Sequence, residues 1–167
     1  IQAADIDERA LARELPSAYA LRIAKKKAEK VGKQNENSFV LAADTVVACG
    51  RRIMPKAETE AEADRCLNLL SGRRHKVLGA VVIYSPNGTQ IYRVVKSVVT
   101  FKKLTQEEIN FYLKTREWEG KAGGYAIQGL AATYIRALNG SYSNVVGLPL
   151  YETYQMLKGM GFNYKVT

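Results

Sequence analysis

A carboxylate inside an apolar run is the clearest chemical signal in this sequence. Residues 39–47 read FVLAADTVV, which predicts a strand buried on both faces with Asp44 inside it. Burying a charged carboxylate is costly unless it is paired, hydrogen-bonded or bound to a metal, so a partner must compensate Asp44. The alternative is that the strand ends near Ala43 and that Asp44 is a solvated loop or capping residue. Strand ends are also where open α/β sheets bind ligands, so Asp44 is a candidate site residue.

Three lysines are candidate phosphate ligands, because an ammonium group combines a compact charge with three hydrogen-bond donors. Lys27 lies on the apolar face of a predicted helix, Lys56 lies in a predicted loop, and Lys121 lies at the head of the glycine-rich stretch 120–129. Glycine backbone beside Lys121 can approach a ligand closely. The alternatives are that Lys27 extends from the edge of the core into solvent and that Lys56 is simply exposed.

Gln128, in the same glycine-rich stretch, carries a donor and an acceptor on one planar amide. Such a pair suits the edge of a nucleobase, although most glutamines have no such role. The stretch fits neither the Walker A order nor the Rossmann dinucleotide-binding pattern, and its glycines could instead serve turns.

The helix that must position Lys27 is predicted over residues 17–31. Ser17 is its expected N-cap and Gly32 its expected stop. At about 100° per residue, Lys27 falls in the middle of the apolar face of this helix. That face consists of Ala20, Ile23, Ala24 and Val31.

Two capping boxes predict helices in the middle of the chain. Thr59 with Glu62 predicts a helix that stops at residue 72, and Thr105 with Glu108 predicts one of about ten residues. The inner side of the second helix is expected to consist of Ile109, Tyr112 and Leu113.

The remaining pattern indicates strands joined by turns. Strands are predicted over 76–84 and 90–101, and the Ser-Pro-Asn-Gly turn between them predicts an antiparallel hairpin. A further strand is predicted over 131–138 and a last helix after Pro149. Because the elements follow no strict β-α-β rhythm, the predicted fold class is α/β, with a mixed β-sheet flanked by helices.

Length and charge limit the classes of protein that this chain can represent. The 167 residues predict a single domain over residues 1–167. With 47% hydrophobic and 25% charged residues, collagen-like, disordered and disulfide-scaffold proteins are disfavoured. Twenty-five basic residues against 16 acidic ones give a net charge of +9, which favours nucleic acid, an anionic membrane surface or phosphorylated small molecules as partners.

Cysteine and histidine usage excludes several kinds of site. Cys49 and Cys66 are too few for a disulfide framework and fit no zinc pattern. His75 is the only histidine, which disfavours a triad built on an imidazole base and leaves carboxylate and lysine chemistry. The sequence shows no apolar run near the ~20 residues of a membrane-spanning helix and no signal-peptide pattern, so we expect a cytoplasmic protein without a membrane partner.

Four ordered segments carry a family resemblance that runs nearly from end to end. They are residues 42–47 (AADTVV), 69–77 (LLSGRRHKV), 121–129 (KAGGYAIQG) and 140–153 (GSYSNVVGLPLYET). Together they resemble the Maf family of nucleoside triphosphate pyrophosphatases. The resemblance implies an elongated Maf/ITPase-like α/β fold with a substrate cleft. It also implies hydrolysis of a nucleoside triphosphate to the monophosphate and pyrophosphate, with Mg²⁺ or Mn²⁺ as cofactor.

The resemblance also implies roles for the charged residues. Asp44, in the family's Ala-Asp-Thr motif, is expected to be the general base, and Glu8, in residues 5–8 (DIDE), an acidic residue near the site. Both carboxylates are the expected metal ligands. Lys27 matches the family's helical lysine, and Lys56 matches a lysine that the family often places in Gly-Lys-Pro, where this chain has Pro-Lys-Ala. We expect these two lysines, with Lys121, to stabilise charge that develops on the phosphates.

Substrate choice is implied to lie with Thr45 and Gln128. The last two of the four segments look like those of the subgroup that acts on dTTP and UTP, and differ from those of the subgroup that acts on 7-methyl-GTP. Gln128 is expected to pair with N3–H and O4 of thymine or uracil, which present a donor beside an acceptor. The resemblance further implies an N-terminal strand and a Ser-x-Ser-Pro-Arg-Arg loop, and we expect this chain to start after that element.

Two other functions remain open at this point. One is a non-catalytic nucleotide-binding regulator linked to cell division, as the family's septum-formation name suggests. The other is a nucleic-acid-binding module, for which the net charge and ten tyrosines speak. The tyrosines fall within predicted elements rather than among basic residues, so we expect no nucleic-acid partner. The resemblance is compatible with a homodimer.

Overall fold

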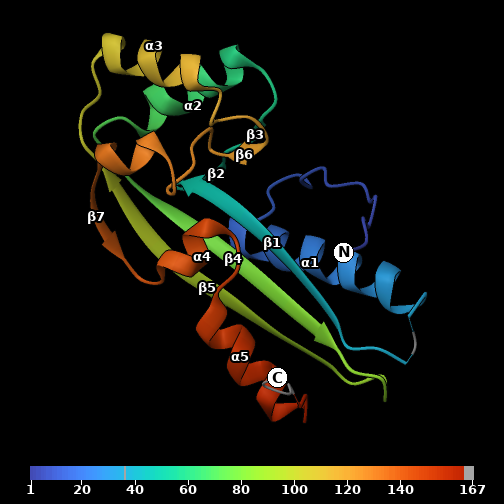
Figure 1. The fold of residues 1–167 in the computed structure, drawn as a ribbon. Helices are drawn as coiled ribbons and strands as arrows, with labels where there is room; N and C mark the ends of the chain where they lie inside the picture. Colours follow the sequence, from blue (N-terminus) through green and yellow to red (C-terminus); the bar gives the residue numbers. More distant parts are fainter. Residues whose placement is uncertain (36, 164–167) are drawn as a thin grey trace.

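A five-stranded antiparallel sheet forms the centre of the molecule (Figure 1). The computed structural model describes residues 1–35 and 37–163. Neighbouring strands follow the order β2-β1-β4-β5-β7. These strands are β1 (Val40–Cys49), β2 (Arg52–Ile53), β4 (Arg74–Tyr84), β5 (Gln90–Phe101) and β7 (Ile135–Asn139).

The α/β class with flanking helices is confirmed, but the prediction of a mixed sheet is wrong, because each pairing among the described strands is antiparallel. The predicted hairpin between β4 and β5 is also confirmed, with Val81 opposite Arg93. Gly88 has φ +80° in its turn, a conformation that glycine adopts without steric cost. A separate two-stranded sheet pairs β3 (Lys56–Ala57) with β6 (Lys121–Ala122).

Helices cover both faces of the long hairpin. α1 (Pro16–Gly32) packs its alanines against Leu78, Ala80 and Val82 of β4. α5 (Leu150–Gly159) packs Met156 against Val81 and Ile83. Because alternate side chains of a strand point to opposite faces, these contacts place α1 and α5 on opposite sides of the sheet. In the described part of the chain, no helix has both the length and the apolar character needed to cross a bilayer.

The largest core lies at one end of the sheet, beneath α2 (Glu60–Leu70) and α3 (Gln106–Thr115) (Figure 1). Both predicted capping boxes are present, since Thr59 and Thr105 accept hydrogen bonds from the N–H groups three residues later. The predicted inner residues of α3 are buried. The β3–β6 sheet lies beside this core and carries two of the candidate lysines.

Two predictions about element ends are wrong. Ser17 is not the N-cap of α1, because Pro16, which lacks an N–H group and has a φ suited to a first helical turn, begins the helix after Leu15. Residues 131–138 are not one strand: η1, a 3₁₀ helix (Leu130–Tyr134), precedes β7. The carboxylate of Glu117 accepts a hydrogen bond from Leu130 N–H at 2.8 Å and so stabilises the start of this helical turn. The short helix α4 (Tyr142–Val146) was not predicted.

Candidate active site

Strand β1 presents two adjacent polar residues to opposite faces of the sheet. The strand continues to residue 49, so Asp44 is a strand residue rather than a loop residue, and it is 6% exposed. Its carboxylate faces α1, where it accepts a hydrogen bond from Lys27. Thr45 lies toward α4, and its hydroxyl donates to the Gly147 carbonyl at 3.2 Å.

Four charged side chains form one continuous chain of ion pairs. Lys27 Nζ lies 2.8 Å from Asp44 Oδ1 and 2.8 Å from Glu8 Oε1. Lys56 Nζ lies 2.8 Å from Glu8 Oε2, so Glu8 bridges the two lysines. The structure therefore brings together the four residues that the sequence pointed to for catalysis, although they come from a loop, a helix and two different sheets.

Burial and the ion pairs shift the pKa values of Asp44, Glu8 and Lys27 in different directions. Burial raises the pKa of Asp44 above the ordinary aspartate value, and the hydrogen bond from Lys27 offsets only part of this effect. Burial also raises the pKa of Glu8, but the hydrogen bonds from Lys27 and Lys56 outweigh it and lower the pKa on balance. For Lys27, burial lowers the pKa, while its bonds to Asp44 and Glu8 produce a net rise. The ion pairs therefore favour the charged forms of Asp44, Glu8 and Lys27 against the penalty of burial.

Two cavities adjoin these ion-paired residues. The first, of about 380 Å³, is lined by Glu8, Asp44 and Tyr19 among others. The second, of about 220 Å³, is lined by Lys121, Gln128 and the C-terminal end of α4, among others. Both are lined by Thr45, Lys56 and Ala122.

The β3–β6 sheet contributes Lys56 and Ala122 to the lining of both cavities. In it Ala57 pairs with Lys121, which fixes the positions of Lys56 and Lys121 relative to each other. Gly123 N–H donates to the Pro55 carbonyl at 2.9 Å and continues this link. Gly123 has φ +74°, and a Cβ there would lie 2.9 Å from Val47, so the turn needs glycine on two grounds.

A buried histidine–tyrosine pair lies behind the second cavity and was not predicted from the sequence. Tyr125 lines the cavity, and its hydroxyl lies 2.8 Å from His75 Nε2. Burial lowers the pKa of His75 to about 4 and raises that of Tyr125. His75 is therefore neutral at physiological pH and supports the cavity from the core.

The acidic donors suit a hard divalent cation shared with a phosphorylated ligand. In residues 1–35 and 37–163, no three His, Cys, Asp or Glu side chains gather as a metal site of their own. Mg²⁺ is commonly bound by one or two protein carboxylates and completed by substrate phosphates and water. Asp44 and Glu8, which share Lys27 as a hydrogen-bond partner, supply that kind of donor set.

Sequence reasoning missed the hydrogen bonds that the backbone at Glu8 and Arg9 makes with α1. Tyr19 donates from its hydroxyl to the Glu8 carbonyl at 2.7 Å, and Arg22 donates to the Arg9 carbonyl at 3.0 Å. An irregular segment ahead of a helix gives no periodic signal, so only the tertiary structure reveals these contacts. The acidic pattern at residues 5–8 was the one local indication.

Comparison with known proteins adds independent information. A family model described as Maf-like protein matches residues 1–160. A dTTP/UTP pyrophosphatase of Paramagnetospirillum magneticum is 56% identical over 162 residues, which cover 97% of this chain and 85% of that protein. The dTTP/UTP pyrophosphatase of Caulobacter vibrioides is 53% identical, with coverage of 97% and 84%. A nucleoside triphosphate pyrophosphatase of Ehrlichia canis is 52% identical over 153 residues, with coverage of 92% and 80%.

Proposed function

The chain belongs to the Maf family, and from this premise we propose that it is a nucleoside triphosphate pyrophosphatase that hydrolyses dTTP and UTP. The products are the nucleoside monophosphate and pyrophosphate. Relatives that are 51–56% identical over nearly the whole chain carry the name dTTP/UTP pyrophosphatase, which supports this substrate class.

The observation that carries the proposal is the series of ion pairs that joins Asp44, Lys27, Glu8 and Lys56 beside the two cavities. The cavity that contains Asp44 and Glu8 offers the groups that a triphosphate needs, and the cavity that contains Gln128 offers an amide for a base. Lys56 and Thr45 line both, so one ligand can extend from one cavity into the other. A nucleotide has this two-part character, with a polyanionic end and a flat, hydrogen-bonding end.

Asp44 is the residue best suited to accept a proton from water. Its Oδ1 accepts a hydrogen bond from Lys27, whereas its Oδ2 has no hydrogen-bond partner among the described residues. A pKa raised by burial makes the carboxylate a stronger base than an exposed aspartate. Lys27 holds the carboxylate in place through their hydrogen bond.

Asp44 and Glu8 would hold a divalent cation such as Mg²⁺ or Mn²⁺ together with the substrate phosphates. When bound, such an ion neutralises phosphate oxygens and lowers the pKa of water. Lys27 and Lys56 then present ammonium groups to the triphosphate, and Lys121 adds a third at the rim of the second cavity. Fixed cations of this kind stabilise charge as the phosphoanhydride bond breaks.

Gln128 and Thr45 are the proposed substrate-recognition residues. The Gln128 side-chain oxygen can accept from N3–H of thymine or uracil, and its amide can donate to O4. Thr45 is held by its bond to the Gly147 carbonyl, which places a fixed hydroxyl on the cavity wall. Replacing Gln128 by glutamate removes the donor to O4 and places a negative charge opposite that oxygen.

The test is product analysis with dTTP, UTP, CTP, GTP and 7-methyl-GTP in the presence of Mg²⁺. We expect dTMP and UMP with stoichiometric pyrophosphate, and a drop of about 10-fold in pyrimidine turnover for Gln128→Glu. Release of nucleoside diphosphate and orthophosphate would contradict the proposed bond cleavage. Nucleotide binding without turnover would contradict the enzymatic function and favour a non-catalytic regulator.

A further inference from the structure

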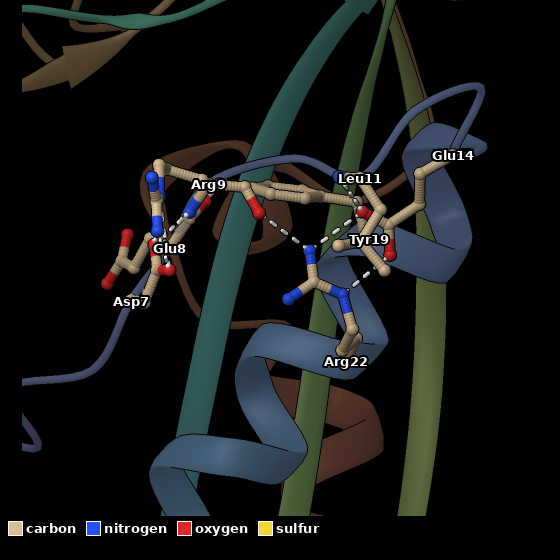
Figure 2. Close-up of polar contacts among 7 residues, drawn as sticks. All are labelled: Asp7, Glu8, Arg9, Leu11, Glu14, Tyr19 and Arg22. Carbon is tan, nitrogen blue, oxygen red and sulfur yellow. Dashed lines mark hydrogen bonds and ion pairs between the residues drawn. The ribbon is translucent and has the colours of Figure 1, made fainter.

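Glu8 lies in a segment that has neither helix nor strand, yet its carboxylate bridges two lysines. Residues 5–14, named here the N-terminal strap, precede α1 and run across it (Figures 1 and 2). A side chain on an irregular segment holds a fixed position only when the backbone beneath it is held. The contacts of the strap backbone therefore decide where the Glu8 carboxylate lies.

Two side chains of α1 hold the backbone of the strap at Glu8. The Tyr19 hydroxyl donates to the Glu8 carbonyl at 2.7 Å. The Arg22 guanidinium donates through Nη2 to the Arg9 carbonyl at 3.0 Å and lies over the Tyr19 ring, 5.5 Å from its centroid. Two successive carbonyls are thus tied to one helix, as Figure 2 shows.

Glu14 completes this arrangement from the far end of the strap. Arg22 Nε and Nη2 bind its two carboxylate oxygens at 2.7 Å each, and Glu14 Oε2 accepts from Leu11 N–H at 3.0 Å. The side chains of Arg22 and Glu14 are 21% and 9% exposed, so solvent screens this pair weakly. A bidentate arginine–carboxylate pair fixes orientation as well as distance.

The strap contains a second ion pair that serves as an internal contrast. Arg9 binds Asp7 at 2.8 Å, but their side chains are 89% and 56% exposed, and the hydrogen bonds of Asp7 are with Arg9 alone among the described residues. Exposed ion pairs of this kind contribute little to the stability of the fold. Arg9 and Arg22 therefore differ in what their ion pairs hold.

The same helix also carries Lys27, about two turns after Tyr19. α1 therefore supplies both the lysine that receives the Glu8 carboxylate and the groups that fix the Glu8 backbone. We infer that Tyr19 and the Arg22–Glu14 ion pair are positioning residues, which hold the strap so that the Glu8 carboxylate bridges Lys27 and Lys56. This inference rests on the role of Glu8 in the proposed function.

The main test is a double-mutant cycle that combines Arg22→Met with Glu8→Gln, measured as kcat/KM for dTTP hydrolysis. We expect Arg22→Met alone to lower kcat/KM about 10-fold, as outer partners of a site commonly do. If Arg22 acts through Glu8, adding Arg22→Met to the Glu8→Gln variant lowers kcat/KM by less than about 2-fold. The carboxylate that Arg22 helps to hold is already absent from that variant. Arg22→Lys keeps the positive charge but not the planar guanidinium that binds both carboxylate oxygens of Glu14. We expect it to be more active than Arg22→Met and less active than the parent.

Tyr19→Phe and Glu14→Gln extend the test without removing the arginine. Tyr19→Phe keeps the ring and removes one neutral hydrogen bond, for which we expect a loss of about 3-fold. Glu14→Gln is matched by Asp7→Asn, since both remove one carboxylate charge paired to an arginine of this region. Activity should fall in Glu14→Gln and stay within about 2-fold of the parent in Asp7→Asn.

Trypsin cleavage after Arg13, followed by mass spectrometry, gives a readout that does not depend on turnover. We expect faster cleavage in Arg22→Met and Glu14→Gln, because the strap is released from α1, and unchanged cleavage in Asp7→Asn.

The outcomes separate the two proposals. If Glu8→Gln keeps full activity, the role of Glu8 in the proposed function is wrong. If Glu8→Gln is impaired but the losses multiply with that of Arg22→Met, only the positioning inference is overturned. Should Arg22→Met fail to fold, the cycle of Tyr19→Phe with Glu8→Gln decides the same question.

Discussion

Replacing His75 by glutamine is predicted to reduce the sensitivity of the fold to acid. His75 is 1% exposed and its ring lies 5.2 Å from that of Phe101 and 5.4 Å from that of Tyr125, measured between centroids. Its Nε2 pairs with the Tyr125 hydroxyl, and its buried Nδ1 has no hydrogen-bond partner within residues 1–35 and 37–163. Burial disfavours the charged imidazolium and lowers the pKa of His75 to about 4.

The sign and size of the effect follow from proton linkage. In the unfolded chain the imidazole takes up a proton near pH 6.5, whereas in the folded protein it does so only near pH 4. Above pH 6.5 both states are neutral and His75 has no effect on the pH dependence. Between these values the unfolded state binds more protons, so the free energy of unfolding falls as pH falls. Each pH unit contributes about 1.4 kcal/mol, which gives a full effect of about 3 kcal/mol.

Urea unfolding at pH 7.5 and pH 5 measures this contribution. Glutamine keeps an amide within reach of the Tyr125 hydroxyl but does not titrate. The carboxylates contribute equally to the pH dependence of both proteins. The difference between the stability losses of the parent and of His75→Gln therefore isolates the contribution of the histidine. We expect the parent to lose about 2 kcal/mol more than the variant between the two pH values. Equal losses would refute the claim that His75 is held neutral.

Three further predictions concern the site. Gly123→Ala should lower the free energy of unfolding by about 2–4 kcal/mol in urea titrations, because the new Cβ meets Val47 and the residue has φ +74°; an unchanged midpoint would contradict the tight turn. Lys56→Met should reduce kcat/KM for dTTP about 10- to 100-fold in steady-state assays, and a full-activity variant would remove Lys56 from phosphate binding. The acid limb of kcat/KM should lie above the ordinary aspartate range, because Asp44 must be ionised and burial raises its pKa. Lys27→Met should move that limb to still higher pH, and a limb that stays in place would show that Lys27 does not act on Asp44.

The contacts that could be predicted from the sequence are those with a local signature. An aspartate in an apolar strand needs a partner, which predicted a partner for Asp44 without naming it, and in the structure that partner is Lys27. The capping boxes at Thr59 and Thr105 also follow from residue type and spacing alone. Predictions of this kind depend on a few neighbouring residues, so they can be made without knowledge of the fold.

The contacts that could not be predicted join segments far apart in the chain. Glu8 and Lys56 are 48 residues apart and come from an irregular strap and a two-residue strand, so no periodicity connects them. At the start of the 3₁₀ helix over residues 130–134, Leu130 N–H donates to the carboxylate of Glu117, 13 residues earlier. The composition of this segment alone is compatible with a strand, and the nonlocal hydrogen bond does not follow from it.

The most direct test of the account is Asp44→Asn, measured for both activity and stability at pH 7. Asparagine keeps an oxygen for Lys27 but cannot accept a proton from water. Because the fold raises the pKa of Asp44, its ionised form lowers stability at pH 7 relative to a neutral side chain. We predict that pyrophosphate release falls about 100-fold or more while the urea midpoint stays equal or rises. Activity within about 3-fold of the parent, in a folded variant, would contradict the assignment of Asp44 as the base.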